Sequence, residues 1–227
     1  MEKSVSIIIP TLNESQTIEN ALHAARALEG LEIIVSDGGS VDDTVARARQ
    51  FAQRHDGDVI VIHSPLGRGR QLAAGARIAR GDVLLFLHAD NQLPAHAISQ
   101  IAQASWPVWG GFRQRIDHPS WRFRILEIGN ALRAIVFGRV FGDQALYVHR
   151  SRYNEVGGFA EVELMEDVLL SSQLFRHHRP RLLAGPVTVD PRRWLRRGVV
   201  RQTWLNWQLQ YAFARGATPE ELRKRYG

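Results

Sequence analysis

The chain has 227 residues, 44% of which are hydrophobic, and it contains no cysteine. This length and apolar content suit one large domain with a substantial core, or a domain with an appended lobe. The lack of cysteine excludes a disulfide framework and a thiolate metal site. The apolar run near the N-terminus is too short for the core of a signal peptide, and no segment approaches the roughly 18 apolar residues of a membrane span. We therefore expect a cytoplasmic protein.

The net charge of +6 is unevenly distributed along the chain. The region from Arg176 to Gly227 has twelve Lys and Arg against three Asp and Glu, whereas the rest of the chain is mildly acidic. A basic C-terminal region indicates an anionic partner, and nucleic acid, a membrane surface and a phosphorylated substrate are the candidates. A solvated basic helix without a partner explains the same pattern.

In the first 105 residues, short apolar segments alternate with helical patterns. The expected strands are 4–12, 31–37, 58–63 and 83–87, and the expected helices are 15–28, 41–55, 69–80 and 94–104. This alternation predicts an α/β fold, with a mostly parallel, Rossmann-like sheet covered by helices on both faces. Such sheets bind ligands beyond the carboxyl ends of their strands.

The second half of the chain is less regular. We expect strands at 108–116 and 144–149 and helices at 121–137, 166–175 and 199–214, which close over the first half without forming an independent domain. The last helix carries Trp204, Trp207, Tyr211 and Phe213. The basic segment 192–215 could contact anionic lipid as a peripheral membrane element, but packing of its aromatic face on the core is favoured by the helical spacing.

Acidic residues follow two of the predicted strands. Asp37 precedes Gly38 and could bind a base or ribose, or it could simply form a turn. Asp90 lies just after a buried strand, where a carboxylate suits Mg²⁺ or Mn²⁺ bound together with substrate phosphates. His88 points to the same side as Asp90 if the strand continues. Because imidazole is a poor ligand for Mg²⁺, we assign His88 a supporting role.

Three further segments could carry chemistry. Arg68 and Arg70 begin a helix, and helix N-termini and arginines both bind anions. Neither a Walker loop nor a G-x-G-x-x-G follows any predicted strand, which argues against a classical ATPase or dinucleotide site. Glu166 and Asp167 begin another helix, as first-turn acids or as a general base. Four arginines surround Trp194, and they could bind phosphates, lipid headgroups or only water.

Six motifs now occur in a familiar order: SIIIPTLNE, SDGGSVDDT, LLFLHAD, GDQALYVHR, GGF and MED. Together they resemble the family-2 glycosyltransferases, which have the GT-A fold, over almost the whole chain. HAD, GDQ, MED and the following RRW look like a small bacterial subgroup associated with arsenosugar biosynthesis. The resemblance implies one domain over residues 1–227, with a nucleotide-sugar-binding half at 1–105 and an acceptor-binding half at 106–227.

The resemblance also implies transfer from a UDP-linked sugar to an acceptor hydroxyl, usually with inversion. Asp167, with Glu166 beside it, matches the catalytic base, and Asp90 matches the last acid of the D-x-D motif, which would hold Mg²⁺ or Mn²⁺. His88 replaces the first acid of that motif, so the affinity for the metal and the choice of metal are expected to differ from those of the family pattern. The residues implied near the donor are Pro10, Thr11, Glu14, Asp37, Gly38, Arg68, Gln71, Ala89, Arg192, Arg193 and Trp194, with Asp143 and Gln144 on the acceptor side.

Two other functions compete with this interpretation. A nucleotidyltransferase is disfavoured because PTLNES lacks the glycine-rich, basic loop expected after the first strand. A nucleotide-sugar-binding regulator, or a degenerate transferase without turnover, stays open because of His88. The partners implied are a nucleotide sugar and an unidentified acceptor, and nucleic acid is not among them.

Overall fold

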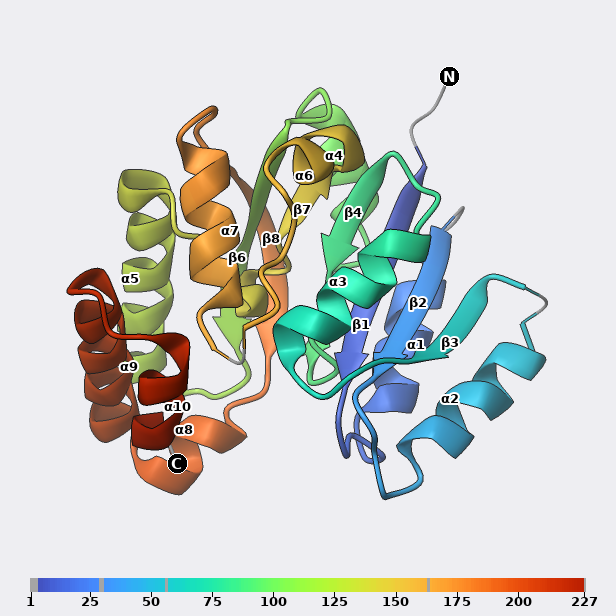
Figure 1. Ribbon diagram of the computed structural model, residues 1–227, viewed down its shortest axis with the longest axis horizontal. Coiled ribbons are helices and arrows are strands. Elements are labelled where there is room, and N and C mark those ends of the chain that lie inside the picture. Colours follow the sequence, from blue (N-terminus) through green and yellow to red (C-terminus); the bar gives the residue numbers. More distant parts are fainter. Residues whose placement is uncertain (1–3, 29–30, 56, 163, 227) are drawn as a thin grey trace.

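The computed structural model describes residues 4–28, 31–55, 57–162 and 164–226, although the side chains of Leu31, Arg193, Ala214 and residues 223–226 lie outside this description (Figure 1). Within these ranges, eight strands form one sheet in the order β3-β2-β1-β4-β7-β6-β8-β5. The strands are β1 (Val5–Thr11), β2 (Leu31–Asp37), β3 (Val59–His63), β4 (Val83–Phe86), β5 (Asn91–Gln92), β6 (Trp109–Ile116), β7 (Tyr147–His149) and β8 (Arg181–Val189).

Helices flank the sheet in Figure 1. They are α1 (Ile18–Arg26), α2 (Thr44–Gln53), α3 (Arg68–Ile78), α4 (Ala97–Gln103), α5 (Trp121–Phe137), α6 (Arg150–Glu155), α7 (Glu166–Phe175), α8 (Arg192–Arg197), α9 (Val199–Ala214) and α10 (Pro219–Tyr226), with a 3₁₀ turn, η1, at Gly142–Gln144. The predicted helices 121–137, 166–175 and 199–214 are confirmed at both ends.

The prediction of a mostly parallel α/β sheet is confirmed. Strands β3, β2, β1 and β4 are parallel neighbours. Beyond β4 the sheet is mixed, because β7 runs antiparallel to β4 and to β6, whereas β6 and β8 are parallel. Strand β8 was not predicted. The predicted strand 144–149 begins too early, because its first residue belongs to η1 and β7 starts at Tyr147.

Apolar side chains on each face of the sheet form a separate cluster with the helices that cover it. Ile7 and Ile9 of β1 pack with α1, α2 and α4, whereas Ile8 packs with α3, α6 and α7. Strand residues alternate between faces, so a near-continuous apolar strand such as β1 needs helices on both sides. A third cluster joins the start of α7 to α9 and α10 through Met165, Val168, Leu209 and Leu222.

The aromatic residues of α9 are divided between two environments. Phe213 is half-buried against the third cluster. Trp204, Trp207 and Tyr211 are 63%, 72% and 62% exposed, respectively. The favoured expectation that the aromatic face of this helix packs on the core is therefore wrong for these three residues. Every helix within the described ranges, including α9, is too short or too polar to cross a bilayer.

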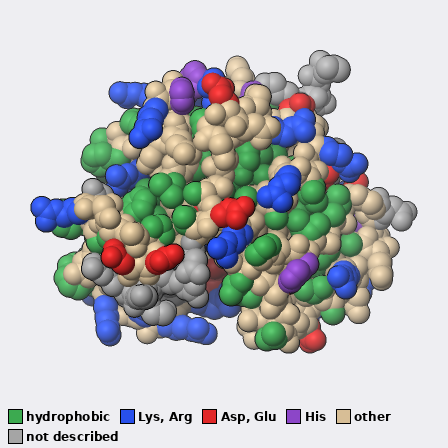
Figure 2. Space-filling view, viewed as in Figure 1, with side chains coloured by type: hydrophobic (Ala, Val, Ile, Leu, Met, Phe, Trp, Pro, Cys, Tyr) green, Lys and Arg blue, Asp and Glu red, His purple; other side chains and the backbone are tan. Residues whose placement is uncertain are grey.

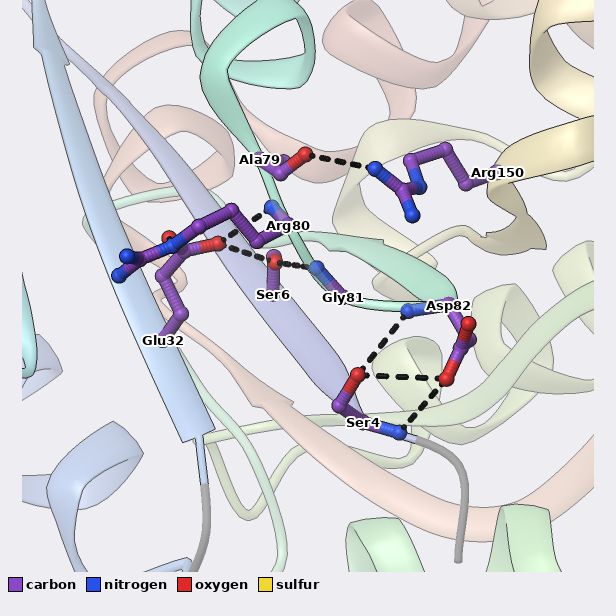
Figure 3. Close-up of polar contacts among 8 residues, drawn as sticks. All are labelled: Ser4, Ser6, Glu32, Ala79, Arg80, Gly81, Asp82 and Arg150. Atoms are coloured by element: carbon purple, nitrogen blue, oxygen red, sulfur yellow. Dashed lines mark hydrogen bonds and ion pairs between the residues drawn. The ribbon is translucent and has the colours of Figure 1, made fainter. Parts of the chain in front are cut away.

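The amino-terminal edge of the parallel strands is closed by a polar network (Figure 3). Glu32 accepts hydrogen bonds from the Ser6 hydroxyl and from the backbone and side chain of Arg80. Asp82 accepts from the backbone N–H and hydroxyl of Ser4. Because these partners belong to three neighbouring strands and their preceding loops, the network fixes this edge of the sheet.

Candidate active site

The carboxyl ends of β1, β2 and β3 lie side by side, with Thr11 opposite Asp37 and Asp37 opposite His63. The Asp37 carboxylate accepts hydrogen bonds from the Thr11 hydroxyl, from the backbone N–H groups of Gly39 and Ser40, and from the Ser40 hydroxyl. Burial opposes ionisation of Asp37, but these hydrogen bonds outweigh it and hold its pKa below the usual range. Asp37 therefore shapes the loop after β2.

Gln71 is buried on the first turns of α3. Its amide nitrogen donates to the carbonyl oxygens of Thr11, at 2.7 Å, and Ser36, at 3.1 Å. A Cβ atom at Gly38 would lie 2.9 Å from the Gln71 side chain, so this glycine permits the close approach. Gln71 thus ties α3 to the tips of β1 and β2. The neighbouring donor candidate Pro10 is buried within β1.

Glu14 follows β1 and lies in the electrostatic field of Asp90, Asp42 and Arg192. Burial raises the pKa of Glu14, an effect that the Thr17 hydrogen bond opposes and the Asp90 charge reinforces. Asp90 is half-buried in the turn after β4, and its carboxylate accepts no hydrogen bond from the described part of the chain. Two carboxylates and one arginine therefore influence one another at this edge, although they come from distant parts of the sequence.

The carboxylates of Glu14 and Asp90 suit a divalent metal ion whose remaining coordination positions are filled by a bound substrate. The described residues contain no cluster of three or more His, Cys, Asp or Glu that could hold a metal without further ligands. Mg²⁺ in nucleotide-dependent enzymes, however, is commonly bound by only one or two carboxylates together with substrate phosphates. Asp90, with Glu14 near it, suits that arrangement.

His88, Gly142 and Asp167 come together from three different elements. A Cβ atom at Gly142 would lie 2.3 Å from Nε2 of His88, so only glycine leaves room for this imidazole. The Gly142 backbone N–H donates to Oδ2 of Asp167 at 3.0 Å, and Oδ1 accepts from the backbone N–H of Val168 at 2.8 Å. His88 therefore packs against the turn that orients the Asp167 carboxylate. This contact supports a role for His88 in positioning that turn.

Arg133 on α5 is a site residue that sequence reasoning missed. Its guanidinium lies 3.6 Å from the Phe141 ring centroid and donates to Gln144 Oε1 at 3.0 Å. Burial lowers the pKa of Arg133, whereas the charges of Asp143 and Asp167 raise it. A lone arginine within the apolar stretch ALRAIVF was the available signal.

The 3₁₀ turn η1 is held by buried amides. The carbonyl oxygen of Asp143 accepts from Asn91 at 3.4 Å and from Gln114 at 3.1 Å. Gln144 is buried, and its side-chain oxygen also accepts from the Phe141 N–H. Gln144 therefore braces the turn, whereas the half-buried side chain of Asp143 lies within the field of Arg133.

Glu166 is almost fully buried and forms an ion pair with Arg68, which connects the start of α7 to the start of α3. Burial raises the pKa of Glu166; Arg68 opposes this shift and the adjacent Asp167 reinforces it. A buried carboxylate paired with an arginine is suited to fixing the geometry of its neighbours. The more exposed Asp167 is the better placed of the two acids to meet a substrate.

The RRW segment divides between core and surface. Trp194 is buried against Phe123, at a centroid distance of 6.1 Å, and anchors α8. Arg192 pairs with Asp190 at 2.6 Å. The predicted donor contact of Arg193 concerns a side chain that lies outside the described residues. Ala89 is buried in the core beside Asp90.

Comparison with solved structures identifies the class of fold. A mannosyltransferase from Pyrobaculum calidifontis, solved with GDP-Man and Mn²⁺, matches 98% of this chain and 69% of its own at a TM-score of 0.63 and 20% identity. TarS from S. aureus, solved with UDP-GlcNAc, matches 82% of this chain and 58% of its own at a TM-score of 0.61 and 17% identity. The fold is the GT-A fold of glycosyltransferases.

The sequence comparison then gives the family. Residues 6–124, more than half of the chain, match the model of glycosyl transferase family 2, and the chain belongs to this family. A PGL/p-HBAD biosynthesis glycosyltransferase of Mycobacterium bovis is 30% identical over 68% of this chain and 62% of the relative. An undecaprenyl-phosphate 4-deoxy-4-formamido-L-arabinose transferase of Pseudomonas syringae is 30% identical over 53% of this chain and only 39% of the relative. The chain thus spans less than two thirds of these relatives.

Proposed function

We propose that this protein transfers a sugar from a UDP-linked donor to an acceptor hydroxyl, with inversion at the anomeric carbon. The observation that carries the proposal is the Asp167 carboxylate, which the Gly142 N–H orients at a turn packed against His88. Membership of the family and the GT-A fold support the reaction class. The HAD, GDQ, MED and RRW motifs support membership of the subgroup associated with arsenosugar biosynthesis.

In the proposed reaction, Asp167 accepts the proton of the acceptor hydroxyl. The acceptor oxygen then bonds to the anomeric carbon, while the bond from that carbon to the diphosphate oxygen breaks and the nucleoside diphosphate leaves with the electron pair. Glu166 does not serve as the base, because it is buried and paired with Arg68; it positions the start of α7. A general base of this kind contributes about 10²–10⁴-fold to the rate.

Asp90 would hold Mg²⁺ or Mn²⁺ together with the donor diphosphate. Glu14 lies near enough to Asp90 for the two carboxylate charges to interact. The metal would neutralise negative charge on the leaving group. Arg192 is a second candidate for this neutralisation, since its charge acts on Glu14 at the same edge. We place the remaining predicted donor contacts, Pro10, Thr11, Asp37, Gly38 and Gln71, at the donor-binding edge of the sheet. Hydrogen bonds from Gln71 and Thr11 connecting α3, β1 and β2 support this placement.

A thermal-shift screen of UDP- and GDP-sugars, with and without Mn²⁺, tests donor binding. Both bases are included because the structural neighbours were solved in complex with UDP-GlcNAc and with GDP-Man. We expect one UDP-sugar to raise the melting temperature more with Mn²⁺ than without it, and Asp90→Ala to abolish the metal-dependent part. Release of UDP would then establish turnover. Stabilisation without UDP release on any offered acceptor would favour the nucleotide-sugar-binding regulator instead.

A further inference from the structure

Helices α5 and α9 expose a continuous set of apolar side chains. On α5 the exposed residues Trp121, Ile125, Ile128, Leu132 and Ile135 recur at intervals of four and three, and on α9 Val200, Trp204, Trp207 and Tyr211 do the same. Each set therefore forms one stripe along its helix. Most of these side chains are more than half exposed, including Ile128 at 61% and Val200 at 73%.

The two stripes border a shared groove of about 650 Å³. Trp121 and Ile125 line it from α5, and Val200, Trp204, Trp207 and Tyr211 line it from α9. Large contiguous apolar surfaces are uncommon on soluble monomers and mark interaction sites. The groove and the two stripes are together called the α5–α9 face.

Helix α9 is apolar on two sides, and the structure uses only one of them for its own core. Leu209 is 3% exposed and packs with Met165 and Val168 of α7 in the third cluster. The stripe containing Trp204 and Trp207 points away from that cluster, since both residues are exposed. The fold thus explains one apolar side of α9, and among the described residues it leaves the other side mostly exposed.

Arginines surround the exposed aromatic rings of the α5–α9 face. The Arg122 guanidinium lies 6.0 Å from the Trp121 ring centroid, and that of Arg215 lies 5.2 Å from Tyr211. Arg196, Arg197 and Arg201 are also exposed on α8 and α9. Figure 2 shows Lys and Arg side chains projecting along the left and lower edges, where Figure 1 places α9 and α8.

Tryptophan, tyrosine and arginine around an apolar stripe are the composition of an interfacial membrane element. The aromatic rings suit the boundary between headgroups and acyl chains, and the arginines complement anionic headgroups. A second copy docking through the same face would instead bring one arginine rim against another, because a two-fold interface pairs identical surfaces. Charge complementarity therefore favours anionic lipid over a second copy.

We propose that the α5–α9 face binds the interface of an anionic lipid bilayer, with its aromatic side chains inserted among the headgroups and its arginines against lipid phosphates. The surface includes α5 and is therefore larger than the basic segment 192–215 alone. Because the core-facing side of α9 packs on Met165, two residues before Asp167, docking places the proposed catalytic base one helix away from the bilayer. Only this statement about the catalytic base rests on the proposed function. Taken together with that function, docking implies that the acceptor is presented at the membrane surface.

The test is co-sedimentation of the full chain with phosphatidylcholine vesicles, with or without phosphatidylglycerol. We expect binding that depends on phosphatidylglycerol and weakens with added salt. The Trp204→Ser/Trp207→Ser variant should bind at least about tenfold more weakly for each tryptophan lost. The matched control is Ile78→Ser, which replaces an exposed apolar residue at the end of α3 and should bind like the wild type. Arg196→Glu/Arg201→Glu should lose the preference for anionic vesicles.

Absence of wild-type pelleting, or full binding by the double tryptophan variant with its fold intact by circular dichroism, would overturn the proposal. A dimer in light scattering that Trp204→Ser/Trp207→Ser dissociates, without vesicle binding, would also overturn it and identify a second copy as the occupant. Vesicle binding requires no donor, so it can be scored whether or not UDP is released. Binding without turnover supports this inference while contradicting the proposed function.

Discussion

The two edges of the parallel strands both carry carboxylates, but they satisfy them differently. At the amino-terminal edge, Glu32 and Asp82 accept hydrogen bonds from strands and loops of the protein itself (Figure 3). At the carboxyl-terminal edge, Asp37 accepts hydrogen bonds from its own loop and Glu166 pairs with Arg68. Burial nevertheless raises the pKa of Glu14, and the Asp90 carboxylate accepts no hydrogen bond from the described residues. A carboxylate with its own donors stabilises the fold, whereas one without them is available to a ligand.

The largest contrast between the edges should appear in turnover. Asp167→Asn keeps an oxygen that can accept from the Gly142 N–H but removes the basic site, so we expect UDP release to fall by about 10²–10⁴-fold. Asp82→Asn makes the same chemical change at the amino-terminal edge and should leave turnover unchanged. Rates measured at saturating donor, with melting temperatures for both variants, decide the comparison. Wild-type turnover in Asp167→Asn would remove Asp167 as the base.

The next effect tests the packing of His88 behind the proposed base. Gly142→Ala places a methyl group against the imidazole, and we expect a loss of about 1–3 kcal/mol in stability. The displaced turn should also lower turnover by up to about 100-fold, since a small misplacement of a catalytic group is costly. Urea unfolding and UDP release measure the two effects.

A matched control exists at Gly129 on α5, where an added Cβ would meet nothing within 4 Å. Gly129→Ala should stabilise the protein by up to about 1 kcal/mol because alanine is the better helix former. Adding His88→Ala to Gly142→Ala should recover part of the lost stability, because it restores the space. Equal costs for Gly142→Ala with and without His88 would contradict this contact.

The sequence predicted the parallel half of the fold because its signals are local. Apolar runs, helical spacing and the Asp-Gly-Gly turn after β2 are each complete within a few residues. Strand β8 escaped prediction because its sequence, RLLAGPVTV, has Gly185 and Pro186 in its interior, and these residues are typical of turns and strand breaks. In α9, two apolar stripes are present, and no local pattern tells which of them meets the core.

The site residues show the same limit. The motifs brought Asp90, Asp167 and Gln71 into one proposed site, but they gave no reason to expect that Gln71 bonds the backbone of Thr11 and Ser36. Arg133 drew no attention as a site residue because its partners, Gln144 and the ring of Phe141, lie in a different element. Contacts of this kind are properties of the assembled fold, which a motif cannot supply.

A smaller effect compares the same substitution at both edges. Glu32→Gln replaces an acceptor of three hydrogen bonds with an amide that points donors at Ser6 or Arg80, and we expect a loss of about 1–3 kcal/mol at pH 7. Glu14→Gln should be neutral or slightly stabilising, because burial already disfavours its charge. Urea unfolding of both variants gives the difference. An equal loss at the two sites would contradict the contrast between the edges.

The smallest effect is the pH dependence of the stability changes caused by Glu32→Gln and Glu14→Gln. These two pH dependences should have opposite signs. Hydrogen bonds from Arg80 and Ser6 outweigh burial and hold the pKa of Glu32 below 4.5, so its contribution is present above that value and is lost as the pH falls through the folded pKa. Burial raises the pKa of Glu14 above 4.5, so its stabilising contribution is present below that value and is lost as the pH rises through the folded pKa. Unfolding free energies between about pH 3 and pH 7 should therefore show the deficit of Glu32→Gln shrinking on acidification while the wild type gains on Glu14→Gln. Parallel shifts in both variants would mean that the two carboxylates share one environment, and the distinction between a structural and a ligand-facing edge would fail.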